Sequence, residues 1–174
     1  PEECVLLDPL RDANPFFHLY EALWILAGHD DVTRVARYAP HIATFSDDGL
    51  AFYGAYGARM RSRYGVDQVQ KVIDLLRADP DSRRAVIGLW NPLDSGKSTK
   101  DLPCNTTVYF KVRERRLNML VCNRSNDAVW GCFGANAVHF SFLQQYIAGQ
   151  LEVQLGVYHQ VSDSLHLYLN EASS

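Results

Sequence analysis

Several signals that would assign this 174-residue protein to a class are missing. The sequence has no run of ~18 apolar residues and no basic-then-apolar leader, so nothing indicates a membrane span or export. We therefore expect a cytoplasmic protein. Seventeen basic residues stand against 20 acidic ones, and the resulting net charge of −3 argues against a general nucleic-acid-binding surface. Any anionic ligand must then be held by a local arginine cluster.

The four cysteines lack the spacing of a metal site or a disulfide framework. Cys4, Cys104, Cys122 and Cys132 form no C-x-x-C pair, and no histidine stands at ligand spacing beside them. Free thiols in a reducing compartment fit this pattern best, and we predict no metal centre. Cys104 follows a proline at the start of an apolar run. It is either a small residue at a strand end or a nucleophile.

The chain has the composition of one globular domain, residues 1–174, with 47% apolar and 21% charged residues. Apolar periodicity predicts helices over 15–27, 31–39, 66–82 and 136–149, the third ended by Pro80 and the last by Gly149. A strand is predicted over 83–90, a hairpin of strands over 106–122 that turns near Glu114 and Arg115, paired strands over 151–169, and a loop over 45–60. Helices followed by a meander of strands favour an α+β fold over a doubly wound parallel sheet.

The first helix has clear end signals and one unusual residue. Asn14 is a candidate N-cap, Pro15 suits the first helical position, and Gly28 can end the helix in a left-handed conformation. Glu21 lies inside this apolar helix. It either faces solvent or pairs with an arginine, or it is buried with a raised pKa and moves protons near neutral pH.

Two clusters of polar residues interrupt the apolar pattern. Arg83 and Arg84 stand side by side before an apolar run, which indicates an anion site or an interface unless they form ordinary rim salt bridges. The stretch "CNRSND" offers a guanidinium at Arg124, a hydroxyl at Ser125 and a carboxylate at Asp127. A guanidinium close to Cys104 would favour its thiolate.

The segment "WGCFGAN" follows directly. Its glycines allow the backbone to approach a flat ligand, and Asn136 offers an amide that can read the edge of a heterocycle. A simple polar turn is the alternative explanation for this region.

The pieces "YEALWILAG", "YGARMR", "DPDSRRAVIGLWNP", "LPCN", "CNRSND", "GANAVHFSFLQQYIAG" and "HLYLN" occur in this order over about residues 12–170. Together they resemble the thymidylate synthase superfamily, which includes pyrimidine nucleotide hydroxymethylases. The resemblance implies a mixed or antiparallel sheet packed with helices, a sheet face that forms a homodimer interface, and 5,10-methylenetetrahydrofolate as the one-carbon donor.

The resemblance also implies catalytic roles. Cys104 matches the nucleophile that adds to C6 of the pyrimidine, and Glu21 matches the glutamate that organises water and proton transfer. Asp127 matches a residue near the base and the folate, and Tyr56 a tyrosine close to the thiol.

The other matched positions are substrate ligands. By resemblance, Arg124 and Ser125 bind the phosphate, Arg83 and Arg84 reach the phosphate site of the partner subunit, Asn136 reads the pyrimidine edge, and His166 and Tyr168 bind the sugar hydroxyls.

Departures from the synthase pattern favour the hydroxymethylase branch. Asn105 stands where a synthase usually has histidine, and residues 41–49 contain no tryptophan. One residue more than usual separates Asp127 from Asn136. The chain also has no counterpart of the synthase's terminal segments, including the tail that excludes water from the site. It is then either a compact member or a fragment of one. Weak shielding of the reactive exocyclic methylene favours its capture by water over its reduction by hydride.

We expect 5-hydroxymethylation of a cytidine nucleotide, CMP or dCMP. Thymidylate synthesis from dUMP and dUMP hydroxymethylation are the alternatives. A non-catalytic nucleotide-binding relative, or a structural fragment with an inert cysteine, would retain the fold without the chemistry.

Overall fold

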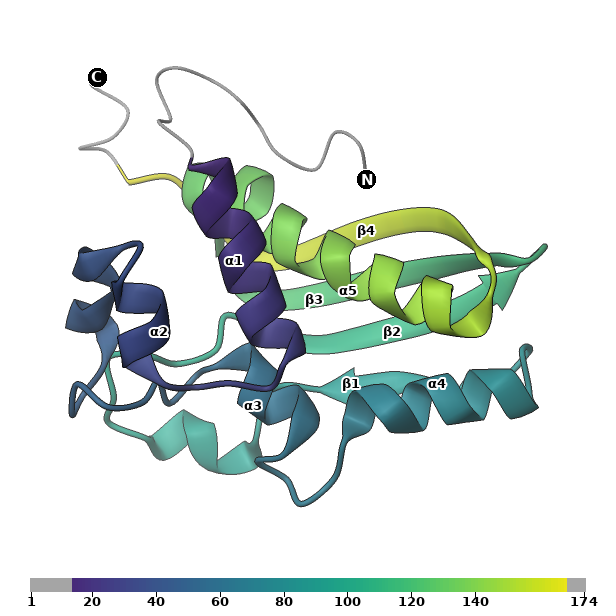
Figure 1. Cartoon of the computed structure of the whole chain (residues 1–174), viewed down its shortest axis with the longest axis horizontal. Coiled ribbons are helices and arrows are strands. Elements are labelled where there is room, and N and C mark those ends of the chain that lie inside the picture. Colours follow the sequence, from purple (N-terminus) through teal and green to yellow (C-terminus); the bar gives the residue numbers. More distant parts are fainter. Residues whose placement is uncertain (1–13, 169–174) are drawn as a thin grey trace.

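A computed structural model describes residues 14–168 of the chain, so Cys4 lies outside the described residues. Its centre is a four-stranded mixed sheet (Figure 1). In spatial order the strands are β1 (Val86–Gly88), β2 (Asn105–Arg113), β3 (Arg116–Asp127) and β4 (Gln154–His166). The first three pair antiparallel, whereas β4 runs parallel to β3. This mixed sheet with its helices confirms the predicted α+β class.

Helices cover one face of the sheet. The α-helices of the described residues are α1 (Pro15–Leu26), α2 (Val32–Ala36), α3 (Tyr56–Arg61), α4 (Gln68–Ala78) and α5 (Asn136–Leu151). Shorter helical segments are η1 (Pro40–Phe45), η2 (Pro92–Gly96) and η3 (Ala128–Ala135), the last of which is π-helical. Figure 1 shows α4 and α5 in front of the strands and α1 beside α5. Within residues 14–168, no helix has the length and apolar character that crossing a membrane requires.

The predicted ends of the first helix are confirmed, and the second and third helices lie within the predicted ranges but end earlier, at Ala36 and Ala78. The Asn14 side chain accepts a hydrogen bond from the Phe17 backbone N–H at 3.0 Å, and Gly28 has a left-handed φ of 82° after α1. Two predictions were wrong. The helix predicted to end at Gly149 continues to Leu151, and Glu152 supplies the left-handed residue with a φ of 55°. The predicted loop 45–60 contains the start of α3, whose backbone is held by tertiary contacts that sequence periodicity does not reveal.

The strand predictions were right about the hairpin and wrong about its surroundings. Glu114 and Arg115 both have positive φ values, 50° and 57°, and join β2 to β3 in a two-residue turn. The paired strands predicted for 151–169 are the single strand β4, which can lie parallel to β3 because α5 forms the crossover between them. The stretch "CNRSND" is the end of β3 itself rather than a turn after it.

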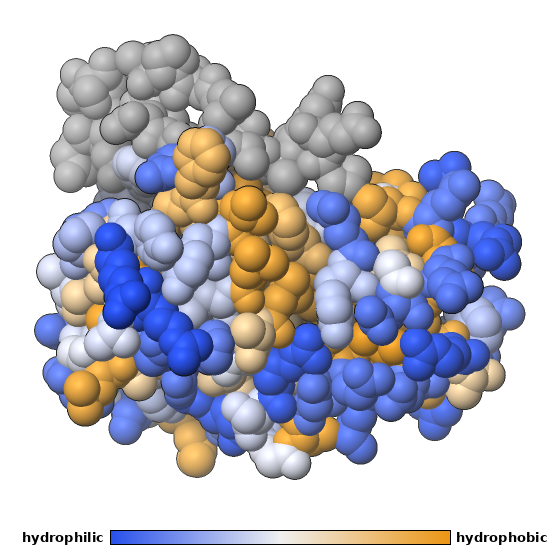
Figure 2. All heavy atoms as spheres, viewed as in Figure 1, coloured by the Kyte–Doolittle hydropathy of each residue, from blue (hydrophilic) through white to orange (hydrophobic). Residues whose placement is uncertain are grey.

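The core lies between the sheet and the helices. Strand residues alternate, so that one side of each strand is buried and the other is open. The fully buried side chains from the strands and from the helices that cover them include Ile87, Val108, Phe110, Leu117, Met119, Val121, Val69, Ile73, Leu76, Val138, Phe140, Leu143 and Ile147. Apolar side chains also gather on the outer surface of the molecule over α1 (Figure 2), where Phe16, Leu19 and Leu23 are exposed.

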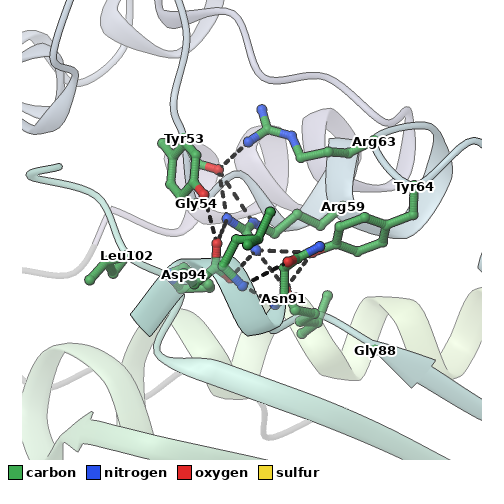
Figure 3. Close-up of polar contacts among 12 residues, drawn as sticks. Tyr53, Gly54, Arg59, Arg63, Tyr64, Gly88, Asn91, Asp94 and Leu102 are labelled. Carbon is green, nitrogen blue, oxygen red and sulfur yellow. Dashed lines mark hydrogen bonds and ion pairs between the residues drawn. The ribbon is translucent and has the colours of Figure 1, made fainter. Parts of the chain in front are cut away.

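A buried ion pair connects α3 to the segment that precedes the predicted nucleophile (Figure 3). The Nη1 atom of Arg59 lies 2.6 Å from Oδ2 of Asp94, and the two side chains are 1% and 0% exposed. Arg59 also donates to the Leu89 carbonyl at 2.8 Å, and the Tyr53 hydroxyl donates to Oδ1 of Asp94 at 2.7 Å. Burial raises the pKa of Asp94, but the hydrogen bonds from Arg59, Asn91 and Tyr53 lower it by more, to about 2.

Replacement of Asp94 by alanine is expected to lower the free energy of unfolding by about 3–5 kcal/mol, because it leaves the guanidinium of Arg59 buried without its partner. Urea denaturation followed by circular dichroism measures this loss. Asp81→Ala is the matched control, since Asp81 pairs with Arg113 at 3.4 Å on the surface and is 93% exposed. The control should lose no more than about 1 kcal/mol, and similar losses for the two variants would contradict the structural role of the buried pair.

Candidate active site

One cavity of about 290 Å³ collects three of the four predicted catalytic side chains, whereas the fourth, Asp127, does not line it. Cys104, Glu21, Tyr56 and Asn136 all line it, although they come from four different parts of the chain. The remaining wall is largely apolar and aromatic, with side chains from α1, α2, η1 and the segment that follows η1: Trp24, Ile25, Val35, Ile42, Phe45 and Phe52. A flat, partly apolar ligand is the kind that such a cavity accommodates.

Cys104 is held by the backbone at the entrance to β2. Its N–H donates to the Tyr56 hydroxyl at 3.2 Å, and the N–H of Asn105 donates to the same oxygen at 3.3 Å. Burial raises the pKa of the Cys104 thiol, Arg124 lowers it and Asp101 raises it, with a net rise. The predicted effect of Arg124 is therefore present, but burial outweighs it, and the thiol is the resting form.

Arg124 holds the loop that carries the cysteine. Its Nε donates to the Pro103 carbonyl at 3.0 Å and its Nη2 to the Leu102 carbonyl at 3.3 Å. Its backbone N–H donates to the Cys104 carbonyl at 2.9 Å, and its guanidinium lies 5.4 Å from the centre of the Trp90 ring. A guanidinium has five N–H donors, so others are left for an anionic ligand.

Glu21 has a partner from a distant part of the chain. Its Oε2 lies 2.9 Å from Nε2 of His139 on α5, and both residues line the cavity. Burial raises the pKa of Glu21, but His139, with smaller contributions from His18 and His41, lowers it by more. Neither alternative from the sequence holds in full, because Glu21 pairs with a histidine rather than an arginine and its pKa is lowered rather than raised. The available signal was that His139 stands three residues after Asn136, on the same face of a helix.

His18 adds a third titratable group next to this pair. Its ring centre is 6.2 Å from that of His139, and ligand atoms of His18, Glu21 and His139 lie within 4.8 Å of one another. Two imidazoles and a carboxylate are donor types that transition metals accept. The direct contact between Glu21 and His139 accounts for their arrangement without an ion.

Asn136 begins α5 and is 8% exposed. Its Nδ2 donates to Oδ1 of Asn126 at 2.9 Å, and Nδ2 of Asn126 lies within hydrogen-bond distance of both Gln160 and Ser162. Gly131 packs against the Asn126 amide, where a Cβ would lie 2.4 Å from Oδ1. This glycine therefore allows close packing within the protein, in addition to any approach to a ligand.

Asn105 belongs to the same buried network of amides. It is fully buried, and its Nδ2 donates to Oδ1 of Asn123, whose own Nδ2 is 3.2 Å from the Ser162 hydroxyl. The side chain after the cysteine thus supports the sheet beneath the cavity. The residues between Asp127 and Asn136 form η3, whose backbone is interrupted by non-helical φ/ψ values at Gly134.

These features can now be compared with known proteins. The family model described as thymidylate synthase matches residues 11–174. The chain belongs to the thymidylate synthase family. It is 49% identical over 170 residues to a protein named deoxyuridylate hydroxymethyltransferase from Pseudomonas phage M6, an alignment that covers 97% of this chain and 48% of the phage protein.

Two further relatives extend the comparison. A protein of the same name from Bacillus phage SP01 is 43% identical over 173 residues, covering 92% of this chain and 45% of that protein. A putative thymidylate synthase from Methanosarcina barkeri is 30% identical over 165 residues, covering 94% and 70%. The chain therefore spans about half the length of the two phage relatives.

The remaining family positions lie at the ends of β3 and β4. Asp127 pairs in register with His166 on β4. Ser125 lies two residues earlier on β3 and pairs with Ser164. The Asp127 Oδ1 accepts the Trp130 N–H at 2.5 Å, whereas its buried Oδ2 has no hydrogen-bond partner among the described residues. The rings of His166 and Tyr168 meet edge to face at 5.3 Å. These side chains lie at the same end of the sheet as Arg124.

Arg83 and Arg84 lie elsewhere in the thymidylate synthase fold. Both precede β1 and are exposed, so neither lies on the core side. The register of β1 on β2 places them roughly 25 Å from Cys104, at about 3.3 Å per strand residue. Within one subunit they are not part of the cavity.

The balance of charges around Cys104 predicts how its reactivity depends on pH. Arg124→Met should slow alkylation of Cys104 by iodoacetamide over about pH 7 to 10, because loss of the guanidinium raises the thiol pKa further. Arg124→Lys keeps the positive charge and should remain nearer to the wild type. Mass spectrometry of the labelled cysteine measures the rate.

Arg116→Met is the control, since Arg116 is exposed on β3. A pH profile of Arg124→Met that coincides with that of the wild type would contradict the electrostatic role of Arg124.

Proposed function

We propose that this protein is a folate-dependent enzyme that hydroxymethylates C5 of a pyrimidine nucleoside monophosphate. The observation that supports the proposal most strongly is that Cys104, Glu21, Tyr56 and Asn136 share one cavity. A purely nucleotide-binding relative would need neither the cysteine nor the buried glutamate. The phage relatives named deoxyuridylate hydroxymethyltransferase support the same reaction class.

The proposed reaction begins at Cys104. Its sulfur adds to C6 of the pyrimidine, which makes C5 nucleophilic. Methylenetetrahydrofolate supplies the one-carbon unit that C5 then attacks, and the apolar wall with Trp24, Phe45 and Phe52 suits flat rings of this kind. Because burial keeps Cys104 protonated at rest, attack requires the proton to leave as the nucleotide binds.

Hydroxymethyl rather than methyl is the product that we propose. The wall formed by η1 consists of Ile42 and Phe45, in the region where the family resemblance leads us to expect tryptophans in a synthase. Aromatic side chains that shield the exocyclic methylene favour hydride transfer, whereas access of water favours its hydration.

Deoxyuridylate is the proposed substrate, since the phage relatives are named for it. From the sequence alone, a cytidine nucleotide is the first candidate. The amide of Asn136 can present a donor or an acceptor to either uracil or cytosine, so CMP and dCMP are alternative substrates to dUMP.

Incubation with methylenetetrahydrofolate and dUMP is expected to give a hydroxymethyl nucleotide without dihydrofolate. The assay compares dUMP, dCMP and CMP by product mass, and Cys104→Ser should reduce the product to background. A methyl product with dihydrofolate would identify a thymidylate synthase instead. If no covalent adduct forms with a 5-fluoropyrimidine nucleotide and the folate, the protein is a non-catalytic relative.

The open face of the sheet supports a homodimer. Helices cover the other face (Figure 1), whereas Tyr109, Val157 and Val161 are 40%, 54% and 56% exposed. We propose that two copies pair through this face. Arg83 and Arg84, which do not reach the cavity of their own subunit, would then bind phosphate in the partner's site, together with Arg124 and Ser125.

Mixing two inactive variants tests this arrangement. Cys104→Ser and a double Arg83→Ala, Arg84→Ala variant should regain activity together, because random exchange creates intact sites at about a quarter of the positions. Turnover of dUMP measures the recovery after exchange at low protein concentration. Val161→Glu in both partners is the control and should prevent recovery. Absence of recovery between dimeric variants would contradict shared sites.

A further inference from the structure

We propose that His139 is a positioning residue for the capture of water. It holds Glu21 as a carboxylate directed at the substrate, and Glu21 then acts as the general base on the attacking water. The proposal rests on the hydroxymethylation proposed above and deepens it. No position on α5 other than Asn136 was assigned a role from the sequence.

The geometry places the pair at the reacting centre. Glu21 comes from α1 and His139 from α5, and the two helices pack beside each other (Figure 1). The 2.9 Å contact between Oε2 and Nε2 lies on the wall of the cavity that Cys104 also lines. His139 is three residues from Asn136, so the two residues lie on the same face of α5. That face presents both the residue proposed to contact the pyrimidine and the partner of the general base Glu21.

Glu21 faces titratable groups from several elements. These are His18 on α1, His139 on α5, His41 on η1, and Tyr56, Asp101 and Cys104 across the cavity. The histidines lower the pKa of Glu21, and His139 does so most, against the rise that burial causes. Without His139, less would offset the rise that burial causes in the pKa of Glu21, so the carboxylate would be protonated at a higher pH.

The chemical step balances without an oxidant or a reductant. In the covalent intermediate, Cys104 is bonded to C6, and C5 carries an exocyclic methylene conjugated to the C4 carbonyl. The water oxygen bonds to the methylene carbon, the proton of the water passes to Glu21, and the electron pair of the exocyclic double bond moves to the C4 oxygen. The enolate then reforms its carbonyl and restores the C5–C6 double bond as the thiolate of Cys104 leaves.

His139→Gln tests the proposal, because glutamine can donate a hydrogen bond without a positive charge. At about pH 6 the variant should lose about tenfold or more in kcat, since general-base catalysis contributes about 10²–10⁴-fold. The acid limb of the pH profile of kcat should move to higher pH, and KM for dUMP should change little. His29→Gln is the matched control, because His29 contacts Arg34 outside the cavity.

A second measurement does not depend on turnover. Carbon-13 NMR of the glutamate carboxyl groups, with the Glu21 signal identified by its loss in Glu21→Gln, should show Glu21 titrating at higher pH in His139→Gln than in the wild type. Equal titration in the two proteins, or an unchanged acid limb, would overturn the proposal. Loss of activity with EDTA and its return with a divalent ion would also overturn it, in favour of a metal held by His18, Glu21 and His139.

The two measurements separate this proposal from the proposed function. A wild-type protein that makes no hydroxymethyl nucleotide, but whose Glu21 titration depends on His139, contains the ion pair without the reaction. That result would overturn the catalytic role together with the proposed function.

Discussion

The buried ion pair between Arg59 and Asp94 fixes the frame on which the cavity is built. Arg59 belongs to α3, whose first residue is Tyr56, and Asp94 belongs to η2, which precedes the loop that carries Cys104. Both charges are removed from water, so they are tolerated only while each satisfies the other. The pair therefore determines how closely the tyrosine and the cysteine segments approach. The hydrogen bonds from the Cys104 and Asn105 N–H groups to the Tyr56 hydroxyl depend on that approach.

The cavity combines two kinds of environment. Its apolar wall removes water from Cys104 and Glu21, which by itself favours the uncharged forms of both groups. The responses of the two groups differ because their neighbours differ. Arg124 offsets burial only in part and leaves Cys104 a thiol, whereas His139, with His18 and His41, more than offsets it and leaves Glu21 a carboxylate. A protonated thiol and an ionised carboxylate in one cavity follow from these positions.

A network of side-chain amides supports the cavity from the sheet side. Asn105, Asn123, Asn126 and Asn136 are connected through Gln160 and Ser162 on β4, so the strand that follows α5 helps to orient the first residue of α5. Buried amides of this kind are costly unless each finds a partner. The network therefore restrains the orientation in which Asn136 can meet a base.

The sequence by itself determined the fold class, the hairpin at Glu114 and Arg115, the start of α1 and the family, because these depend on local periodicity, on turn chemistry and on short motifs in order. It also indicated Cys104, Glu21 and Asn136. Only the tertiary structure decided the ionisation of Glu21, since its partner His139 is 118 residues away in the chain and meets it only when α1 packs on α5. For the same reason, the single parallel strand β4 and the burial of Asn105 could not be predicted from local pattern, because both depend on which segments become neighbours in the sheet.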